Sequence, residues 1–188
     1  MRIFFAGAGT AGHVEPALAV ARWLRQHSPE VELHFLGTAE GIETKLVPAA
    51  GFPLYLISKS PFPRRLNLSA LTWPFLFRKS LRQTHDLLVG ADLVIGFGGY
   101  VAAPAYLAAR RAGIPIIAHE ANAKTGLANK LALRCGATLM YALSGSEGDR
   151  VGIPLRPEIV DLVAVTRDER LTAKRTALRA LNLDPLAP

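Results

Sequence analysis

The sequence predicts an α/β protein built on a doubly wound parallel sheet. Short runs of consecutive apolar residues recur along the chain, and strands covered on both faces show this pattern. Helix-length stretches separate the runs, and regular alternation of strand and helix indicates a parallel sheet between two helical layers. The expected strands are residues 2–6, 31–36, 53–57, 92–95, 115–119 and 137–141, and the expected helices are residues 16–26, 42–50, 68–88, 102–112 and 126–133.

Length and composition are those of a folded globular protein. The chain has 188 residues, of which 50% are hydrophobic and 20% are charged, which suits one domain and a short remainder. We assign residues 1–156 to the domain and residues 157–188 to a helical linker. A short strand and turn are expected at 151–157, and a polar helix at 167–181. The single cysteine, Cys135, excludes an internal disulfide and indicates a reducing compartment.

Neither a signal peptide nor a transmembrane helix is expected. The apolar run that follows Arg2 is too short for a signal peptide. The most apolar later stretch, residues 66–81, is interrupted by Pro74 and carries Arg78 and Lys79, which disfavours a bilayer span. We therefore expect a cytoplasmic protein.

The net charge of +7 is concentrated in one part of the chain, because no acidic residue occurs between Glu43 and Asp86. Such a segment suits an anionic partner, either nucleic acid or the anionic lipid of the inner leaflet. Aromatic residues beside the cations are typical of a helix that enters the lipid headgroup region, and an ordinary core helix with a solvated basic face is the alternative. The residues expected to dock on a membrane are Arg64, Arg65, Trp73, Phe75, Arg78 and Lys79.

Three loops follow expected strands, at residues 7–13, 96–100 and 119–122. Ligands of such sheets bind outside the carboxyl ends of the strands, so we expect these loops to converge on one cleft. The first loop has the form GxGxxG, whose glycines permit a tight turn and whose helix N-terminus can hold a phosphate. A nicotinamide site would need an acid at the end of the second strand, where Phe35, Leu36 and Gly37 stand instead. A purely structural turn is a further alternative.

Polar residues in the three loops are candidates for chemistry. His13 lies in the first helical turn, where the helix dipole favours the neutral imidazole that a general base requires, although a structural hydrogen bond would explain it equally well. Tyr100 can offer its hydroxyl after Gly98 and Gly99, in a turn that close packing alone could also require. Residues 119–122 supply His, Glu and Asn side chains, for which a solvated loop is the default reading.

Metal and covalent chemistry are not indicated. The sequence contains no Asp-x-Asp pair and no His, Cys or carboxylate cluster with ligand spacing. Neither a Ser nor a Cys stands in a nucleophile motif. No metal or other cofactor is predicted.

Four segments together, in order, resemble the motifs of the MurG family: GAGTAGH, FGGY, HEAN and VGIPLR, where the family usually has GGTGGH, GGY, HEQN and GNPVR. The resemblance covers residues 1–156. It implies the N-terminal, acceptor-binding half of a glycosyltransferase B fold. It also implies inverting transfer of N-acetylglucosamine from UDP-N-acetylglucosamine to the muramyl 4-hydroxyl of lipid I, forming lipid II for peptidoglycan at the cytoplasmic face of the cell membrane. The implied partners are these two substrates and the anionic membrane surface, not nucleic acid.

The resemblance also implies roles for individual residues. His13 and Glu120 become alternative catalytic bases, and Tyr100 and Glu120 become acceptor-side candidates. Four positions depart from the family motifs, namely Ala8, Ala11, Ala121 and Ile153. The implied substrate-binding residues are Thr10, Ala11 and Gly12 beside the donor sugar and diphosphate, Gly98, Gly99 and Tyr100 in the second turn, and Asn122 and Arg156 at the donor.

A MurG chain would continue into a donor-binding domain beyond residue 188. The sequence therefore represents either part of a longer enzyme or the acceptor subunit of a split enzyme whose donor domain is a separate chain, and we expect it to be inactive alone. Two rival hypotheses remain open: a non-catalytic module that binds membranes or nucleic acid, and a nicotinamide-binding domain.

Overall fold

The computed structural model describes residues 1–63, 68–143, 148–164, 167–180 and 184. The chain forms two compact units, Met1–Pro154 and Leu155–Pro188. All strands of the described residues belong to the first unit.

Within the described residues, seven parallel strands form one sheet in the order β3-β2-β1-β4-β5-β6-β7. The chain leaves the centre in one direction through β2 and β3 and in the other through β4 to β7. The predicted fold class is therefore confirmed. The strands are β1 (Arg2–Gly7), β2 (Glu32–Gly37), β3 (Leu54–Leu56), β4 (Leu93–Gly98), β5 (Ile116–Glu120), β6 (Thr138–Tyr141) and β7 (Asp149–Arg150).

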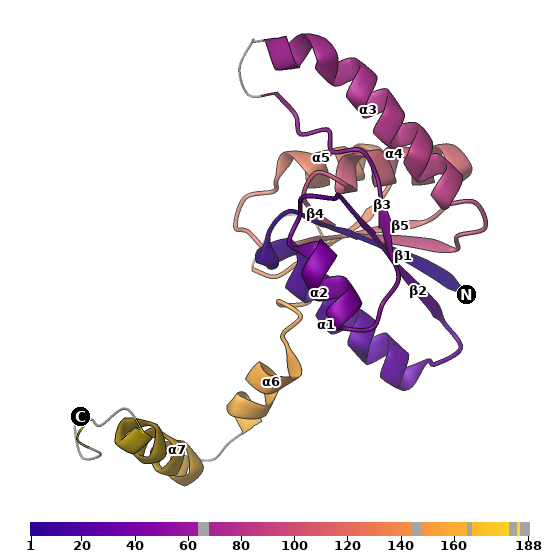
Figure 1. Ribbon diagram of the computed structural model, residues 1–188. Coiled ribbons are helices and arrows are strands. Elements are labelled where there is room, and N and C mark those ends of the chain that lie inside the picture. The colour runs from indigo at the N-terminus through magenta and orange to yellow at the C-terminus, as the bar shows by residue number, and fades with distance from the viewer. Residues whose placement is uncertain (64–67, 144–147, 165–166, 181–183, 185–188) are drawn as a thin grey trace. The chain divides into compact units, whose positions relative to one another are not determined.

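Helices cover both faces of the sheet (Figure 1). Two of them, α1 (Ala11–His27) and α2 (Glu43–Ala49), pack on one face. The other face carries α3 (Leu68–Leu87), α4 (Ala102–Ala112) and α5 (Leu127–Arg134).

Neighbouring residues of β1 show why the strands are continuously apolar. Phe4 belongs to the core cluster beneath α3, α4 and α5, whereas Phe5 belongs to the cluster beneath α1 and α2. Side chains alternate across a strand, so both faces of the sheet require apolar residues. Phe5 stacks on Phe35 of β2, with ring centroids 4.8 Å apart.

The register of the central strands places two loops side by side. Ala6 of β1 pairs with Gly96 of β4, and after an irregularity Gly7 pairs with Gly98. Both strands end at the same edge, so the turns that follow them are neighbours. A Cβ atom at Gly96 would overlap the Tyr106 hydroxyl, which explains the glycine at that position.

Two predictions about individual elements were wrong, and one helix was missed. The expected strand and turn at 151–157 are absent: strand β7 is only Asp149–Arg150, and residues 151–156 have no regular structure. The first helix was expected to begin at Pro16, yet α1 begins at Ala11 after an extended N-cap at Thr10, and Pro16 lies inside it. Helix α6 (Pro157–Ala164) was not predicted.

The second unit contains α6 and α7 (Arg167–Ala180), and the latter matches the polar helix expected at 167–181. The described side chains of α7 are largely exposed.

Candidate functional site

The first glycine turn joins β1 to α1 and leaves the helix N-terminus accessible. Thr10, Ala11 and Gly12 are exposed, and the Thr10 side chain makes no capping hydrogen bond. A Cβ atom at Gly12 would have only Thr10 Oγ1 within 4 Å, at 3.9 Å. Internal packing therefore does not require this glycine, and the unpaired N–H groups of a helix start suit an anionic ligand.

The second glycine turn packs directly against the first. Gly9, Gly98 and Gly99 all have positive φ, at 91°, 101° and 84°. A Cβ atom at Gly99 would overlap the Ala8 carbonyl oxygen, and one at Gly9 would lie 2.8 Å from the Tyr100 ring. The structure thus brings residues 7–13 and 96–100 together.

His13 lies where these two turns meet. A Cβ atom at Gly98 would be 3.0 Å from His13 Nε2, so the imidazole packs over this glycine. His13 Nδ1 is 3.3 Å from the Ala8 carbonyl oxygen and 3.1 Å from Thr10 Oγ1. A carbonyl oxygen only accepts, whereas the Thr10 hydroxyl can accept or donate, so both contacts are hydrogen bonds together only when Nδ1 carries the proton. In that tautomer Nε2 carries the lone pair of a base.

Glu120 ends β5 and is only 2% exposed. Its Oε1 accepts hydrogen bonds from the backbone N–H and the side-chain amide of Asn122, at 3.0 and 2.9 Å. Its Oε2 accepts from Gly126 N at 2.8 Å and Asn129 Nδ2 at 3.0 Å. Burial acts to raise the pKa of Glu120, but these hydrogen bonds outweigh it and hold the pKa below the usual carboxyl value.

Sequence reasoning missed Asn129 and Tyr106, whose side chains hold the loop at residues 119–122 in place. Asn129 of α5 also donates to the His119 carbonyl at 3.0 Å and accepts from the Tyr106 hydroxyl at 3.0 Å. Tyr106 is fully buried, and burial raises the pKa of its hydroxyl. The only sequence signal was an amide within a helix.

Glu43 was also missed, although it is fully buried behind the first glycine turn. Its Oε2 accepts from Gly9 N at 3.0 Å, while Oε1 accepts from Thr38 N at 2.9 Å and Thr38 Oγ1 at 3.2 Å. This carboxylate therefore links the loop after β1 to the loop after β2.

The third predicted loop lies at the neighbouring strand end, where the His119 ring contacts Phe97 at a centroid distance of 5.5 Å. Asn122 is exposed there, and its amide group is held by Glu120. Arg156 belongs to the second unit, where it is exposed and its carbonyl accepts the first hydrogen bonds of α6. Across the described ranges, no three His, Cys, Asp or Glu side chains are grouped so that they could hold a metal ion.

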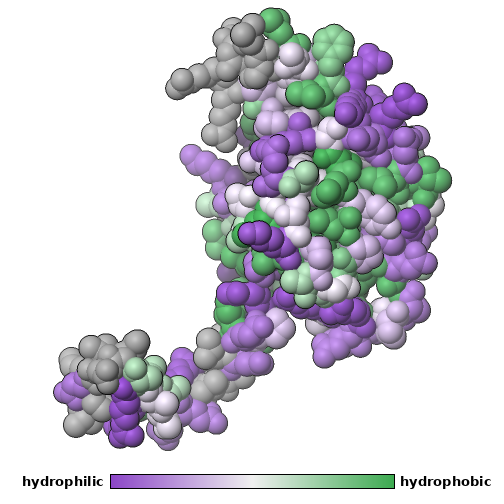
Figure 2. Space-filling view, viewed as in Figure 1, coloured by the Kyte–Doolittle hydropathy of each residue, from purple (hydrophilic) through white to green (hydrophobic). Residues whose placement is uncertain are grey.

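A second candidate surface lies on α3. Leu71, Phe75, Arg78 and Arg82 follow one another at helical spacing and are all exposed, so they share one face of the helix. Hydrophobic and hydrophilic side chains are neighbours over α3 in Figure 2. No helix of the described residues is long and apolar enough to cross a membrane.

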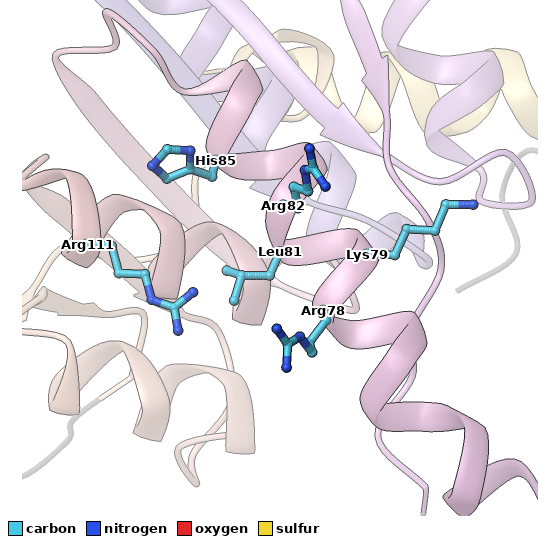
Figure 3. Close-up of a pocket in the computed structure, with 6 residues that line it drawn as sticks. All are labelled: Arg78, Lys79, Leu81, Arg82, His85 and Arg111. Atoms are coloured by element: carbon cyan, nitrogen blue, oxygen red, sulfur yellow. The ribbon is translucent and has the colours of Figure 1, made fainter.

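The basic end of α3 forms one wall of an open cavity of about 780 Å³. Arg78 of α3 and Arg111 of α4 line the same space (Figure 3). In the part of the chain that is described, neither arginine forms an ion pair with an acidic residue. The cavity is separate from the glycine turns, and its lining residues are Arg78, Lys79, Leu81, Arg82, His85 and Arg111.

The two predicted aromatic docking residues differ in their surroundings. Phe75 is 76% exposed. Trp73 is only partly exposed, because its Nε1 donates to the Ser60 carbonyl at 3.3 Å and its ring stacks on Phe77. The predicted docking residues Arg64 and Arg65 lie outside the described residues.

Comparison with known proteins identifies the family. Residues 3–140 match the glycosyltransferase family 28 N-terminal domain. The Corynebacterium jeikeium UDP-N-acetylglucosamine–N-acetylmuramyl-(pentapeptide) pyrophosphoryl-undecaprenol N-acetylglucosamine transferase is 47% identical over 192 residues, which cover 100% of this chain and 50% of that protein. The enzyme of the same name from Corynebacterium glutamicum strain R is 53% identical over 161 residues, or 83% of this chain and 45% of the relative.

Solved structures agree with this result. The crystal structure of Acinetobacter baumannii MurG matches 79% of this chain and 44% of its own, with 34% identity and a TM-score of 0.66. The Streptomyces sp. SF2575 glycosyltransferase SsfS6 has a TM-score of 0.52 at 17% identity over 75% of this chain and 50% of its own, which shows the shared fold alone. The chain spans about half the length of the curated relatives it matches. The resemblance to the MurG family is confirmed, and the chain belongs to glycosyltransferase family 28, as the N-terminal half of MurG-type transferases.

Proposed function

We propose that this chain is the acceptor-binding half of an inverting, metal-independent N-acetylglucosaminyltransferase. The donor is UDP-N-acetylglucosamine, and the acceptor is the muramyl 4-hydroxyl of lipid I, which becomes lipid II for peptidoglycan. The observation that carries the proposal is the position of His13, whose Nε2 is free of hydrogen bonds among the described residues at the junction of two glycine turns. The relatives' names support the choice of substrates.

His13 acts as the general base in this proposal. Its Nε2 takes the proton of the acceptor hydroxyl while that oxygen attacks the anomeric carbon and UDP leaves with the bonding electrons. The imidazolium that forms is stabilised by the hydrogen bond from Nδ1 to the Ala8 carbonyl.

Glu120 has a positioning role rather than the role of base. Both of its oxygens already accept two hydrogen bonds, and its lowered pKa makes the carboxylate a weak proton acceptor. It holds the Asn122 amide by its nitrogen, so the amide oxygen is available to the donor. Arg156 is proposed as a further donor contact, and Tyr100 with Gly98 and Gly99 as the acceptor side. The exposed start of α1, at Thr10, Ala11 and Gly12, borders the donor sugar and diphosphate.

The exposed face of α3 docks on the anionic cytoplasmic face of the cell membrane. Leu71 and Phe75 enter the headgroup region, while Arg78, Lys79 and Arg82 bind lipid phosphates. Trp73 supports this surface from below through Phe77 and the Ser60 carbonyl. The chain itself would then be a peripheral membrane protein that holds its lipid-linked acceptor near the glycine turns.

The rival hypotheses have less support. A nicotinamide cofactor needs an acid free to bind ribose at the end of β2. Of the two acids near that end, Glu40 forms an ion pair with Lys59, and Glu43 already accepts three hydrogen bonds from the protein. A nucleic-acid module would use the basic face alone and would leave the position of His13 unexplained.

A fusion protein tests the proposal. Residues 1–188 are joined to the C-terminal half of the Corynebacterium jeikeium relative, and sugar transfer from UDP-N-acetylglucosamine to a lipid I analogue is measured. We expect transfer by the fusion and none by the 188-residue chain alone. Transfer by the chain alone would refute the half-enzyme proposal, and a folded fusion that transfers nothing would refute the proposed substrates. The same transferase with its own N-terminal half is the positive control.

A further inference from the structure

Glu43 is a buried carboxylate for which core packing offers no reason. It begins α2 and is 0% exposed. Burying a carboxylate costs free energy that an apolar side chain of the same size would not. The surrounding chain is shaped to this group, because a Cβ atom at Gly41 would overlap the carboxylate and one at Gly37 would lie 2.6 Å from Glu43 Cγ.

The Glu43 carboxylate accepts a hydrogen bond from the Gly9 N–H, with 3.0 Å between Gly9 N and Oε2. This N–H belongs to the same peptide group as the Ala8 carbonyl. A peptide group is planar, so fixing its N–H also fixes the direction of its C=O. The Ala8 carbonyl is the group that His13 Nδ1 contacts at 3.3 Å.

We propose that Glu43 is a positioning residue that acts on His13 through the Ala8–Gly9 peptide group. The carboxylate accepts the N–H of this group, and the carbonyl at its other end holds the proton of His13 on Nδ1 and leaves Nε2 as the base. Hydrogen bonds in series polarise one another, so the negative charge strengthens the carbonyl as an acceptor. This inference rests on the proposed role of His13 as the base.

The arrangement also explains two glycines. Gly9 has φ 91°, and Gly99 lies against the Ala8 peptide group so closely that it has no room for a side chain. The peptide group is therefore fixed from three sides, by Glu43, by Gly99 and by His13.

Nitrogen-15 NMR of the 188-residue chain tests the proposal without any sugar transfer. In the unmodified chain we expect His13 in the Nδ1–H tautomer, with well separated shifts of its two ring nitrogens, and a Gly9 amide protected from hydrogen exchange. Glu43→Gln keeps the size of the side chain but presents an NH₂ group to one of its N–H donors. We expect Gly9 exchange to become about tenfold faster or more, a change of about 1.4 kcal/mol, and the His13 ring-nitrogen shifts to converge.

Thr38→Val is the matched control. It removes the hydroxyl hydrogen bond to Oε1 of the same carboxylate and leaves the Gly9 contact in place, so neither readout should change. Unchanged Gly9 and His13 signals in folded Glu43→Gln would overturn the proposal. If that variant does not fold, the unmodified chain decides, because an Nε2–H tautomer of His13 or an unprotected Gly9 amide contradicts the proposal.

A kinetic experiment separates this inference from the proposed function. In the fusion with the donor half, Glu43→Gln should lower kcat and leave the KM for UDP-N-acetylglucosamine within about twofold, because the peptide group orients the base and not the donor. Thr38→Val should leave both constants unchanged. A fusion without transferase activity would refute the proposed function and leave the NMR result standing, whereas an active fusion insensitive to Glu43→Gln would refute the positioning role alone.

Discussion

The glycine-turn edge of the sheet and the outer face of α3 are built on opposite principles. At the edge, backbone groups and buried carboxylates are fixed by short hydrogen bonds, and an added methyl group at Gly99 has no space. On α3, Phe75 and Arg78 are exposed. The first region depends on the position of each atom, while the second depends on the sum of its charges and apolar groups.

The comparison predicts two kinds of mutational response. Single substitutions at the glycine-turn edge should have large effects, because no neighbouring residue can take over the lost contact. Single substitutions on α3 should have small, additive and salt-dependent effects, because exposed charges are screened over about 8 Å at physiological ionic strength.

The largest effect is expected for His13→Ala in the fusion enzyme. Loss of a general base should lower kcat by about 10²- to 10⁴-fold with little change in donor affinity. His27→Ala is the control, because His27 lies at the exposed end of the same helix and should leave kcat unchanged. A loss of tenfold or less for His13→Ala would assign the base elsewhere.

Gly99→Ala should destabilise the fold by about 2–5 kcal/mol. A side chain at positive φ costs about 1–2 kcal/mol, and overpacking against the Ala8 carbonyl costs about 1–3 kcal/mol more. Gly113→Ala is matched, because Gly113 has φ 68° and nothing within 4 Å of an added Cβ, so it should incur only the first cost. Urea denaturation measures the free energy of unfolding of both variants. Equal losses of stability in Gly99→Ala and Gly113→Ala would show that the two glycine turns do not pack tightly.

Glu120→Gln should lower the free energy of unfolding by about 1–3 kcal/mol at neutral pH, since one of the donors now on Oε2 would face an NH₂ group. The folded-state pKa of Glu120 is lowered. Its contribution is therefore complete above the unfolded-state pKa and is lost as pH falls through the lower folded-state value. When the free energy of unfolding is measured from neutral to acidic pH, the values for Glu120→Gln and the unmodified chain should converge in acid. A constant difference across that range would contradict the assignment.

The smallest effect is expected on α3, where Arg78→Gln or Arg82→Gln should each weaken binding to anionic vesicles about fivefold at low salt. Each cation near an anionic surface contributes about 1 kcal/mol. Lys45→Gln is the control, since Lys45 is exposed on α2 at the opposite face of the sheet, and it should change nothing. Phe75→Ala should weaken binding at every salt concentration, because apolar insertion is not screened. An unmodified chain that ignores anionic vesicles at low salt would remove the membrane proposal.

Local patterns were sufficient for most of the architecture. Continuous apolar runs mark strands that are buried on both faces, as Phe4 and Phe5 are, and this requirement is visible within a few residues. The order of the glycine turns, the polar loop at 119–122 and the segment VGIPLR indicated the family. The start of α1 was placed too late, at Pro16, whereas the extended backbone of Thr10 sets the actual beginning.

What the sequence alone determined about this protein is its succession of strands and helices, the glycine turns at the strand ends and the family to which these belong. Only the tertiary structure decided which side chains serve those turns. Glu43 bonds to Gly9 across 34 positions because β2 lies beside β1, and Asn129 reaches Glu120 because α5 packs beneath β5. The Trp73 indole likewise donates to the carbonyl of Ser60, 13 positions earlier in the chain, because the fold brings the two residues together. Spacing along the chain reports local conformation, whereas these contacts depend on strand order and helix packing, which bring distant residues within hydrogen-bonding distance.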